Sequence, residues 1–138
     1  MSKFTFDKVS LAIAVTKDEL SRLLSDRQIA LLKNTRTPFK GGVKCYFYET
    51  KSGGGRGQYV AIGELEKATF YQKGGDMRRD CGLTEDAEEK AASCFRTGNG
   101  IAFYFSNIVE VDDPDALSKA IRLQFLIDPP KTITKMKM

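Results

Sequence analysis

The side chains available for chemistry in this sequence are limited by one missing residue type. The 138 residues contain no histidine, which excludes Ser-His and Cys-His catalytic pairs and every zinc site that uses histidine. The three cysteines, Cys45, Cys81 and Cys94, lie far apart without a C-x-x-C motif, and their odd number argues against a disulfide framework. Any catalysis must therefore use Lys, Thr, Tyr, Cys or carboxylate side chains, and neither a metal nor a cofactor is expected.

Basic residues concentrate in the middle of the chain. From Lys33 to Arg79 there are ten Lys or Arg against four Asp or Glu, and the whole chain has a net charge of +4. Aromatic residues such as Tyr46 alternate with basic residues such as Lys44 and Arg56. Proteins that bind single strands stack bases on aromatic rings and contact phosphates with Lys or Arg. The pattern indicates a polyanionic partner, but a solvated surface over core aromatics would produce the same pattern.

A glycine-rich segment, Ser52–Gly57, is the one motif that suggests a phosphate cradle, because glycine amides can approach an oxyanion closely. A P-loop requires a following Lys-Ser or Lys-Thr and a helix, whereas this segment joins two predicted strands. A hairpin whose Arg56 reaches a nucleic-acid backbone and a passive turn remain as alternatives.

The elements that must position these residues are mainly strands. Alternating apolar residues predict strands over Val9–Val15, Val43–Glu49, Gln58–Phe70, Ile101–Val111 and Ile121–Ile127, with a bend in the third at Gly63. Helices are predicted from the Thr16 capping box to Leu24, over Ser25–Lys33 and Thr84–Phe95, and over a short stretch around Pro114–Ala120. This order predicts an α+β fold in a single domain over residues 1–138.

Three segments in this order resemble the ASCH family of the PUA-like superfamily. They are Gly57-Gln-Tyr-Val-Ala-Ile-Gly-Glu-Leu65, Gly100-Ile-Ala-Phe-Tyr-Phe-Ser-Asn-Ile-Val-Glu-Val111 and Phe125-Leu-Ile-Asp-Pro-Pro-Lys-Thr-Ile-Thr134. In that family a strand with Gly-Glu precedes a helical insert, a strand reading aromatic-x-F-x-N and a closing P-P-x-[ST] segment. The resemblance implies a small, largely antiparallel β-barrel with peripheral helices, which holds RNA or a modified nucleotide in a cleft. It also implies that Asn107 helps to close the barrel.

The segment from Lys33 to Lys40 lies where ASCH-like domains carry a cleft motif, G-x-K-T-x-E-x-R. Through the resemblance, Lys33 stands for the Lys of the motif, and Thr35 or Thr37 stands for its Thr. Arg36 or Lys40 stands for its basic residue. The segment contains neither the Gly nor the carboxylate of the motif.

The same resemblance implies one possible reaction. In amidohydrolase members, which cleave an acetylated cytidine, a Thr nucleophile works with a Lys base and a distant Glu. The corresponding catalytic set here is Lys33, Thr35 or Thr37, and Glu64. A threonine hydroxyl is weakly nucleophilic unless a neighbouring base takes its proton, so the Lys is indispensable. The alternative for Glu64 is a strand residue that faces solvent or pairs with Lys44 across the sheet.

The leading hypothesis is a non-enzymatic domain that binds nucleic acid, RNA above all. Its predicted binding residues are Lys33, Arg36, Lys40, Lys44, Tyr46, Arg56, Arg78 and Arg79. The alternatives are the nucleoside amidohydrolase and a protein-interaction or regulatory module of a phage or mobile element, with a protein partner. No apolar run approaches the roughly 20 residues of a membrane span, so no membrane partner is expected. The N-terminal residues do not resemble a signal peptide, and the cytoplasm is the expected location.

Overall fold

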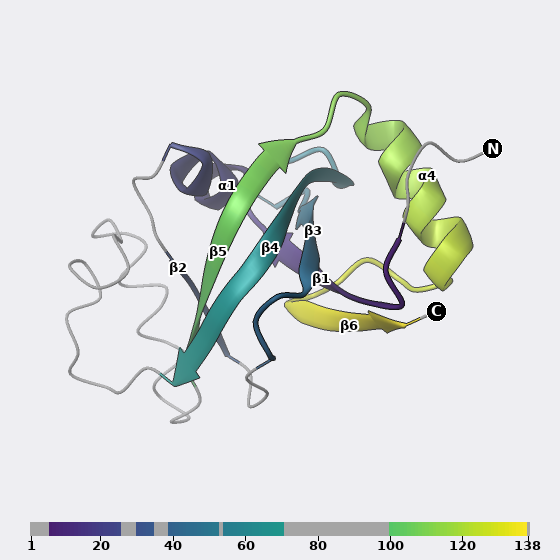
Figure 1. Ribbon diagram of the computed structural model, residues 1–138. Helices are drawn as coiled ribbons and strands as arrows, with labels where there is room; N and C mark the ends of the chain where they lie inside the picture. The colour runs from purple at the N-terminus through teal and green to yellow at the C-terminus, as the bar shows by residue number, and fades with distance from the viewer. Residues whose placement is uncertain (1–5, 26–29, 35–38, 53, 71–99, 138) are drawn as a thin grey trace.

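A computed structural model describes residues 6–25, 30–34, 39–52, 54–70 and 100–137 of the chain. In chain order the elements are β1 (Val9–Val15), α1 (Lys17–Leu24), β2 (Ala30–Asn34), β3 (Lys44–Glu49), β4 (Gln58–Phe70), β5 (Gly100–Glu110), α4 (Pro114–Phe125) and β6 (Ile133–Lys137). Figure 1 shows the long β4 and β5 side by side, with the two helices at separate places on the sheet. The predicted helix Thr84–Phe95 lies outside the described residues.

The six strands form one sheet in the order β2-β5-β4-β3-β1-β6. The β1–β3 pairing is parallel, and the other pairings of the described strands are antiparallel. The predicted α+β, largely antiparallel class is therefore confirmed. The barrel, however, is not closed, because β2 and β6 are the two edges of the sheet and do not pair with each other.

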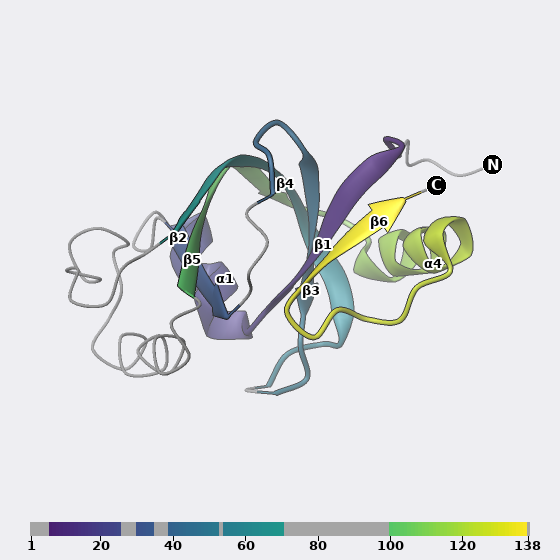
Figure 2. The ribbon, with the colours of Figure 1, turned by 90° about the horizontal axis from the view of Figure 1, so that it is seen from below.

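The sheet nevertheless curls strongly, as the view in Figure 2 shows. Lys33 on the edge strand β2 donates a hydrogen bond from Nζ to the carbonyl oxygen of Ala14 on β1, at 2.6 Å. In a flat sheet β2 and β1 would be separated by three intervening strands, each about 4.8 Å from the next. A lysine side chain could not span that distance, so this contact shows that curvature brings β2 back towards β1.

Helix α1 begins where the sequence predicts. The Thr16 hydroxyl accepts a hydrogen bond from the Glu19 backbone N–H at 3.1 Å, and the Glu19 carboxylate accepts one from the Thr16 N–H at 2.9 Å. This reciprocal capping satisfies two backbone donors that a helix start leaves unpaired. Leu20 and Leu23 then lie on the buried face.

Two helical segments differ from the sequence-based prediction. The predicted helix Ser25–Lys33 is wrong over Ala30–Lys33, because these residues belong to β2, which pairs with β5. Alanine and leucine favour helices, but pairing to a neighbouring strand overrides a weak local propensity. The predicted last strand Ile121–Ile127 is also wrong, because α4 continues to Phe125.

The signal for the longer α4 was a stripe at helical spacing. Leu117, Ile121 and Phe125 recur every four residues and are all buried, as one face of a helix requires. The helix ends at Leu126, whose φ of 53° is left-handed. The Asp128-Pro-Pro-Lys131 segment follows, and the last strand is β6, beyond the two prolines.

The curled sheet separates two hydrophobic cores. The inner core fills the concave side, where α1 packs against inward residues of β1 to β5 such as Leu11, Phe47 and Phe103. The outer core lies on the convex side under α4, around Tyr46, Tyr59 and residues of β1 and β6. In Figure 2 the two helices lie on opposite sides of the strands. Since α4 covers only part of the convex side, the outward residues of β4 and β5 near Tyr104 remain outside this core.

Burial of titratable groups makes the fold sensitive to alkali. Burial raises the pKa of Tyr46 and of Tyr59 to about 12, and that of the Cys45 thiol also to about 12. In an unfolded chain, cysteine and tyrosine lose their protons near about pH 8.5 and about pH 10. Above these values the unfolded state binds fewer protons than the folded state, so stability falls as pH rises towards 12.

We therefore expect the free energy of unfolding to decrease from about pH 9 upwards. Chemical denaturation across this range measures it, with Tyr59→Phe as the comparison. The variant should lose stability less steeply between about pH 10 and about pH 11 than the wild-type chain does. Parallel curves for the two proteins would contradict the assignment of Tyr59.

Candidate nucleic-acid interface

The predicted site residue Lys33 lies on the concave side of the sheet, on the same face of β2 as the buried Leu31. Its ammonium group is held by the Ala14 carbonyl at the place where β2 approaches β1. Thr35, Arg36 and Thr37, which follow it, and Arg78 and Arg79 lie outside the described residues. The structure therefore shows Lys33 in a role that connects two strands.

Glu64 lies on the other side of the sheet. The register of β3 and β4 shifts between Phe47 and Tyr48, which leaves Val60 without a partner on β3. Val60 consequently belongs to the inner core, while Ile62 packs with the outer core. Strict alternation would have placed Val60, Ile62 and Glu64 on one face, and this bulge breaks it. Glu64 is exposed and pairs in register with Lys44 and Ser106, as the solvent-facing alternative expected.

Lys33 and Glu64 do not converge on one cleft. Lys33 is opposite Ile101 on β5, and Glu64 is opposite Ser106. Five residues along a strand correspond to roughly 17 Å. The two side chains also belong to opposite faces of the sheet, so they cannot act on one small substrate.

Tyr46 does not face solvent as the binding prediction required. Its side chain is 1% exposed, and its ring packs against that of Phe6 with centroids 5.6 Å apart. It lies in the outer core with Leu117 and Ile121 of α4. The prediction failed because the helix was expected to end at Ala120 and Ile121 was assigned to a strand, so its packing over this face was not foreseen.

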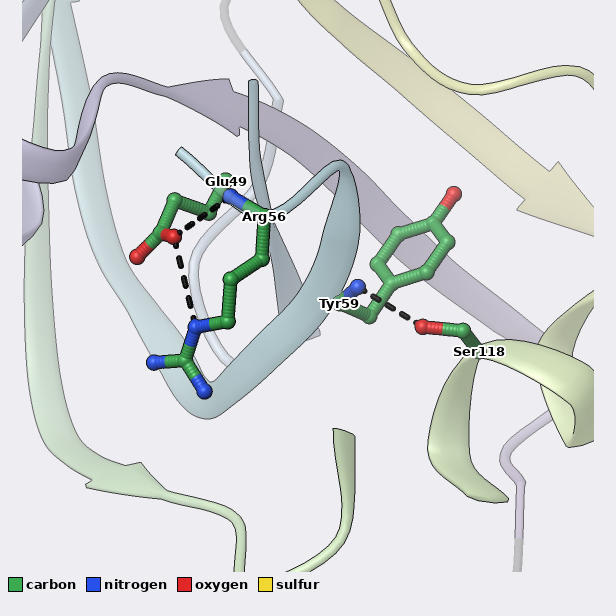
Figure 3. Close-up of polar contacts among 4 residues, drawn as sticks. All are labelled: Glu49, Arg56, Tyr59 and Ser118. Carbon is green, nitrogen blue, oxygen red and sulfur yellow. Dashed lines mark hydrogen bonds and ion pairs between the residues drawn. The ribbon is translucent and has the colours of Figure 1, made fainter. Parts of the chain in front are cut away.

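Arg56 is positioned by a buried carboxylate. Glu49, the last residue of β3, is 4% exposed. One of its oxygens accepts a hydrogen bond from the Arg56 backbone N–H at 2.9 Å and lies 3.5 Å from the Arg56 Nε. The Arg56 side chain is 57% exposed. Figure 3 shows its two terminal nitrogens on the side of the guanidinium away from Glu49, where a further acceptor can reach them.

The hairpin that carries Arg56 depends on Gly55. A side-chain carbon added at Gly55 would lie 1.8 Å from the Thr50 carbonyl oxygen and 2.9 Å from the Glu49 Cγ. Only glycine allows this close approach, which brings Arg56 over Glu49. The Gly57 N–H donates to the Glu49 carbonyl at 2.9 Å and completes the hairpin.

Arg56 lies at a pocket of about 360 Å³ between α1 and the β3–β4 hairpin. Lys17, the first residue of α1, supplies a second cation, and Ser21 supplies a hydroxyl. Glu110, at the end of β5, adds a carboxylate to the rim. The pocket thus has the guanidinium of Arg56, one ammonium group from Lys17, and a rim with a hydroxyl and a carboxylate.

The sequence did not predict that a basic and an aromatic residue would meet on β4 and β5. Lys67 on β4 is directly opposite Tyr104 on β5, with its Nζ 4.8 Å from the centre of the ring. Lys67 was noted as basic, but the contact depends on a bulge at Glu66 in the β4–β5 register, which single-sequence periodicity does not reveal. Lys40 is exposed in the loop before β3, and Lys44 lies on the same convex side as Lys67.

Cys45 and clusters of metal-ligating side chains are the remaining candidates for chemistry among the described residues. Cys45 is fully buried, and burial raises its pKa to about 12, so its thiolate is not populated at neutral pH. No cluster of three or more Cys, Asp or Glu that could hold a metal occurs in the described part of the chain. No helix in that part is long and apolar enough to cross a membrane.

Comparison with known structures identifies the fold. The crystal structure of the ASCH protein from Zymomonas mobilis superposes with a TM-score of 0.71 and 13% identity over 95% of this chain and 90% of that one. Its serine-to-alanine mutant gives 0.69 and 17%, again over 95% and 90%. Its tyrosine-to-phenylalanine mutant gives 0.67 and 14%, over 95% and 91%. No protein-family model matches the sequence, and no curated protein matches it.

The chain therefore has an ASCH-like fold, as the sequence segments predicted. At 13% to 17% identity, this similarity concerns the arrangement of the elements. The function has to be argued from the side chains of this chain.

Gly55→Ala tests the arrangement of the hairpin. The added methyl group would overlap the Thr50 carbonyl, so the backbone must move, at a cost of about 1–3 kcal/mol. The denaturation midpoint should fall accordingly, while Ser52→Ala in the same hairpin should leave it unchanged. Equal stability of the two variants would show that Gly55 is not constrained.

Proposed function

We propose that this chain is a non-enzymatic domain that binds single-stranded nucleic acid, RNA above all. The observation that carries the proposal is the arrangement at Arg56. Its Nε is engaged by the buried Glu49 carboxylate, and the residue lines a pocket that is also lined by Lys17. An arginine fixed in this way is prepared to bind a phosphate oxygen through two parallel N–H groups.

The buried partner of Arg56 supports a binding role. Burying a carboxylate costs several kcal/mol unless hydrogen bonds and an opposite charge compensate it. Here the backbone N–H and the guanidinium of Arg56 provide that compensation. Because Glu49 reduces the freedom of the arginine before any ligand arrives, less entropy is lost on binding.

The distribution of charge and aromatic groups favours a polynucleotide over a small anion. The net charge of +4 attracts polyanions over long range. The exposed Lys40 and Lys67 and the half-buried Lys44 add positive charge on parts of the surface outside this pocket, and Tyr104 adds an aromatic ring beside Lys67. The ASCH-like fold is compatible with a nucleic-acid ligand.

Arg56→Ala tests the proposed contact. Loss of a charge-assisted phosphate contact should weaken binding to single-stranded RNA roughly tenfold, irrespective of sequence. The slope of log affinity against log salt should become shallower by roughly one unit. Fluorescence anisotropy with labelled oligoribonucleotides at several salt concentrations measures both quantities.

Lys135→Ala on β6 is the matched control, since it also removes one exposed positive charge but lies on an edge strand, two strands away from β3. It should change affinity much less than Arg56→Ala. Equal effects of the two substitutions would assign binding to overall charge and remove Arg56 from the interface. If the wild-type chain binds no RNA at low salt, the protein-interaction alternative takes its place.

No observation favours the amidohydrolase. The Lys-Thr-Glu set predicted for it includes Lys33 and Glu64, which lie on opposite faces of the sheet. We expect no acetate release above the uncatalysed rate when the protein is incubated with acetylcytidine, because the predicted base Lys33 is bound to the Ala14 carbonyl and lies on the face of the sheet opposite Glu64. Release that disappears in Lys33→Ala would overturn this expectation.

A further inference from the structure

The pocket at Arg56 contains a carboxylate that a phosphate contact does not use. Glu110, the last residue of β5, is exposed and lines this pocket. Its carboxylate forms no ion pair with a residue in the part of the chain that the structure describes, whereas the other carboxylate, that of Glu49, is bound by Arg56. An unpaired carboxylate repels a bare anion, so Glu110 is compensated only by a ligand that also presents N–H donors.

The pairing of β4 with β5 fixes the position of Glu110. The residue is opposite Ala61 on β4, and the backbone N–H of Val111 donates to the Val60 carbonyl at 2.9 Å. Ala61 belongs to the inner core, and Ile108, two residues before Glu110 on β5, packs against that core. Side chains two residues apart on a strand share a face. The Glu110 side chain therefore leaves β5 on the concave side, where α1 packs.

An apolar floor lies between the charged groups of the pocket. Leu20 of α1 and Val60 of β4 are buried in the inner core, and Leu24 lines the pocket with them. The volume of about 360 Å³ is within the range of about 300–1,000 Å³ that is typical of small-molecule sites. A flat heterocycle with polar groups along its edge matches an apolar floor with a charged rim better than an inorganic ion does.

A carboxylate at such a rim distinguishes among the bases of RNA. Guanine presents two adjacent donors, N1–H and the N2 amino group, which match the two oxygens of a carboxylate. Cytosine and adenine each present one amino group beside an acceptor nitrogen, so only one hydrogen bond forms. Uracil presents its N–H between two carbonyl oxygens, which a carboxylate repels. A single-stranded base is free to offer this edge to a protein.

We propose that the pocket at Arg56 reads one guanine of a bound RNA strand, and that Glu110 accepts hydrogen bonds from its N1–H and N2 amino group. The base lies on the floor formed by Leu20, Leu24 and Val60. Arg56 binds the phosphate of the same nucleotide. This assignment rests on the proposed function, because it adds a base contact to the nucleotide whose phosphate Arg56 holds. The Arg56 contact is common to all sequences, whereas the Glu110 contact depends on one base.

The test compares a short oligouridylate with the same strand carrying one different base at its centre, by fluorescence anisotropy at a fixed salt concentration. A central guanosine should raise the affinity of the wild-type chain roughly tenfold, as one bidentate contact to a base does. Inosine retains N1–H but lacks the N2 amino group, so it should lose most of this gain. Adenosine and cytidine should each give a smaller gain than guanosine.

Glu110→Gln should remove the preference for guanosine, because an amide has one acceptor oxygen and turns an amino group towards the donors of the base. Asp112→Asn is the matched control. Asp112 is an exposed carboxylate two residues further along the chain and does not line the pocket, so its substitution removes the same charge and should keep the preference. Thermal melting checks that both variants are folded.

The assignment of Glu110 is overturned if guanosine gives no gain with the wild-type chain, if Glu110→Gln keeps the full gain, or if Asp112→Asn loses it equally. These results leave the proposed function intact when all strands bind and all bind more weakly to Arg56→Ala. Absence of binding to every strand is a different result, which removes the proposed function and the guanine contact together.

Discussion

The contact between the buried Glu49 carboxylate and Arg56 is the interaction on which the candidate binding site depends. The carboxylate lies at the end of β3, where the β3–β4 connection begins, and is bound by the backbone and the guanidinium of Arg56. A charged group in this position is costly without both contacts. Because Gly55 allows the chain to pass close to it, the connection has one arrangement, with Arg56 on one side and Tyr59 on the other (Figure 3). The pocket at Arg56 is also lined by Glu49, which therefore helps to define its shape and its charge.

Small irregularities in the sheet decide which residues meet. The bulge at Val60 and the one at Glu66 each exchange the faces of the residues that follow them. Lys67 and Tyr104 meet on the convex side as a result, and Glu64 is directed towards solvent. A third irregularity falls at Gly63, where a bend was predicted and where Phe47 and Ile108 leave little room for a side chain. Close by, Asn107 has a left-handed φ of 54°, which asparagine tolerates better than most residues.

Much of the fold could be predicted from the sequence, and the α1 capping box at Thr16 and the ASCH-like order of strands illustrate why. Capping and alternation are local, so single-sequence patterns report them. The site was less predictable, because it depends on contacts between distant segments. The burial of Tyr46 required knowing that Ile121 belongs to a helix, and the separation of Lys33 from Glu64 required the cross-strand register. Arg56 was predicted as a phosphate contact, but nothing in the sequence indicated that Glu49 would be its buried partner.

The most direct measurement of the central claim is a nuclear magnetic resonance titration of the ¹⁵N-labelled chain with single-stranded RNA, observing the arginine Nε–Hε and backbone signals. The account predicts that the Arg56 Nε–Hε signal shifts in a saturable way, together with the backbone signals of Lys17 and of the β3–β4 connection. Signals of β6 should not move. Two results would contradict the account. In one, RNA shifts the signals of β6 while the Arg56 signals remain unchanged. In the other, RNA shifts no signal of the chain.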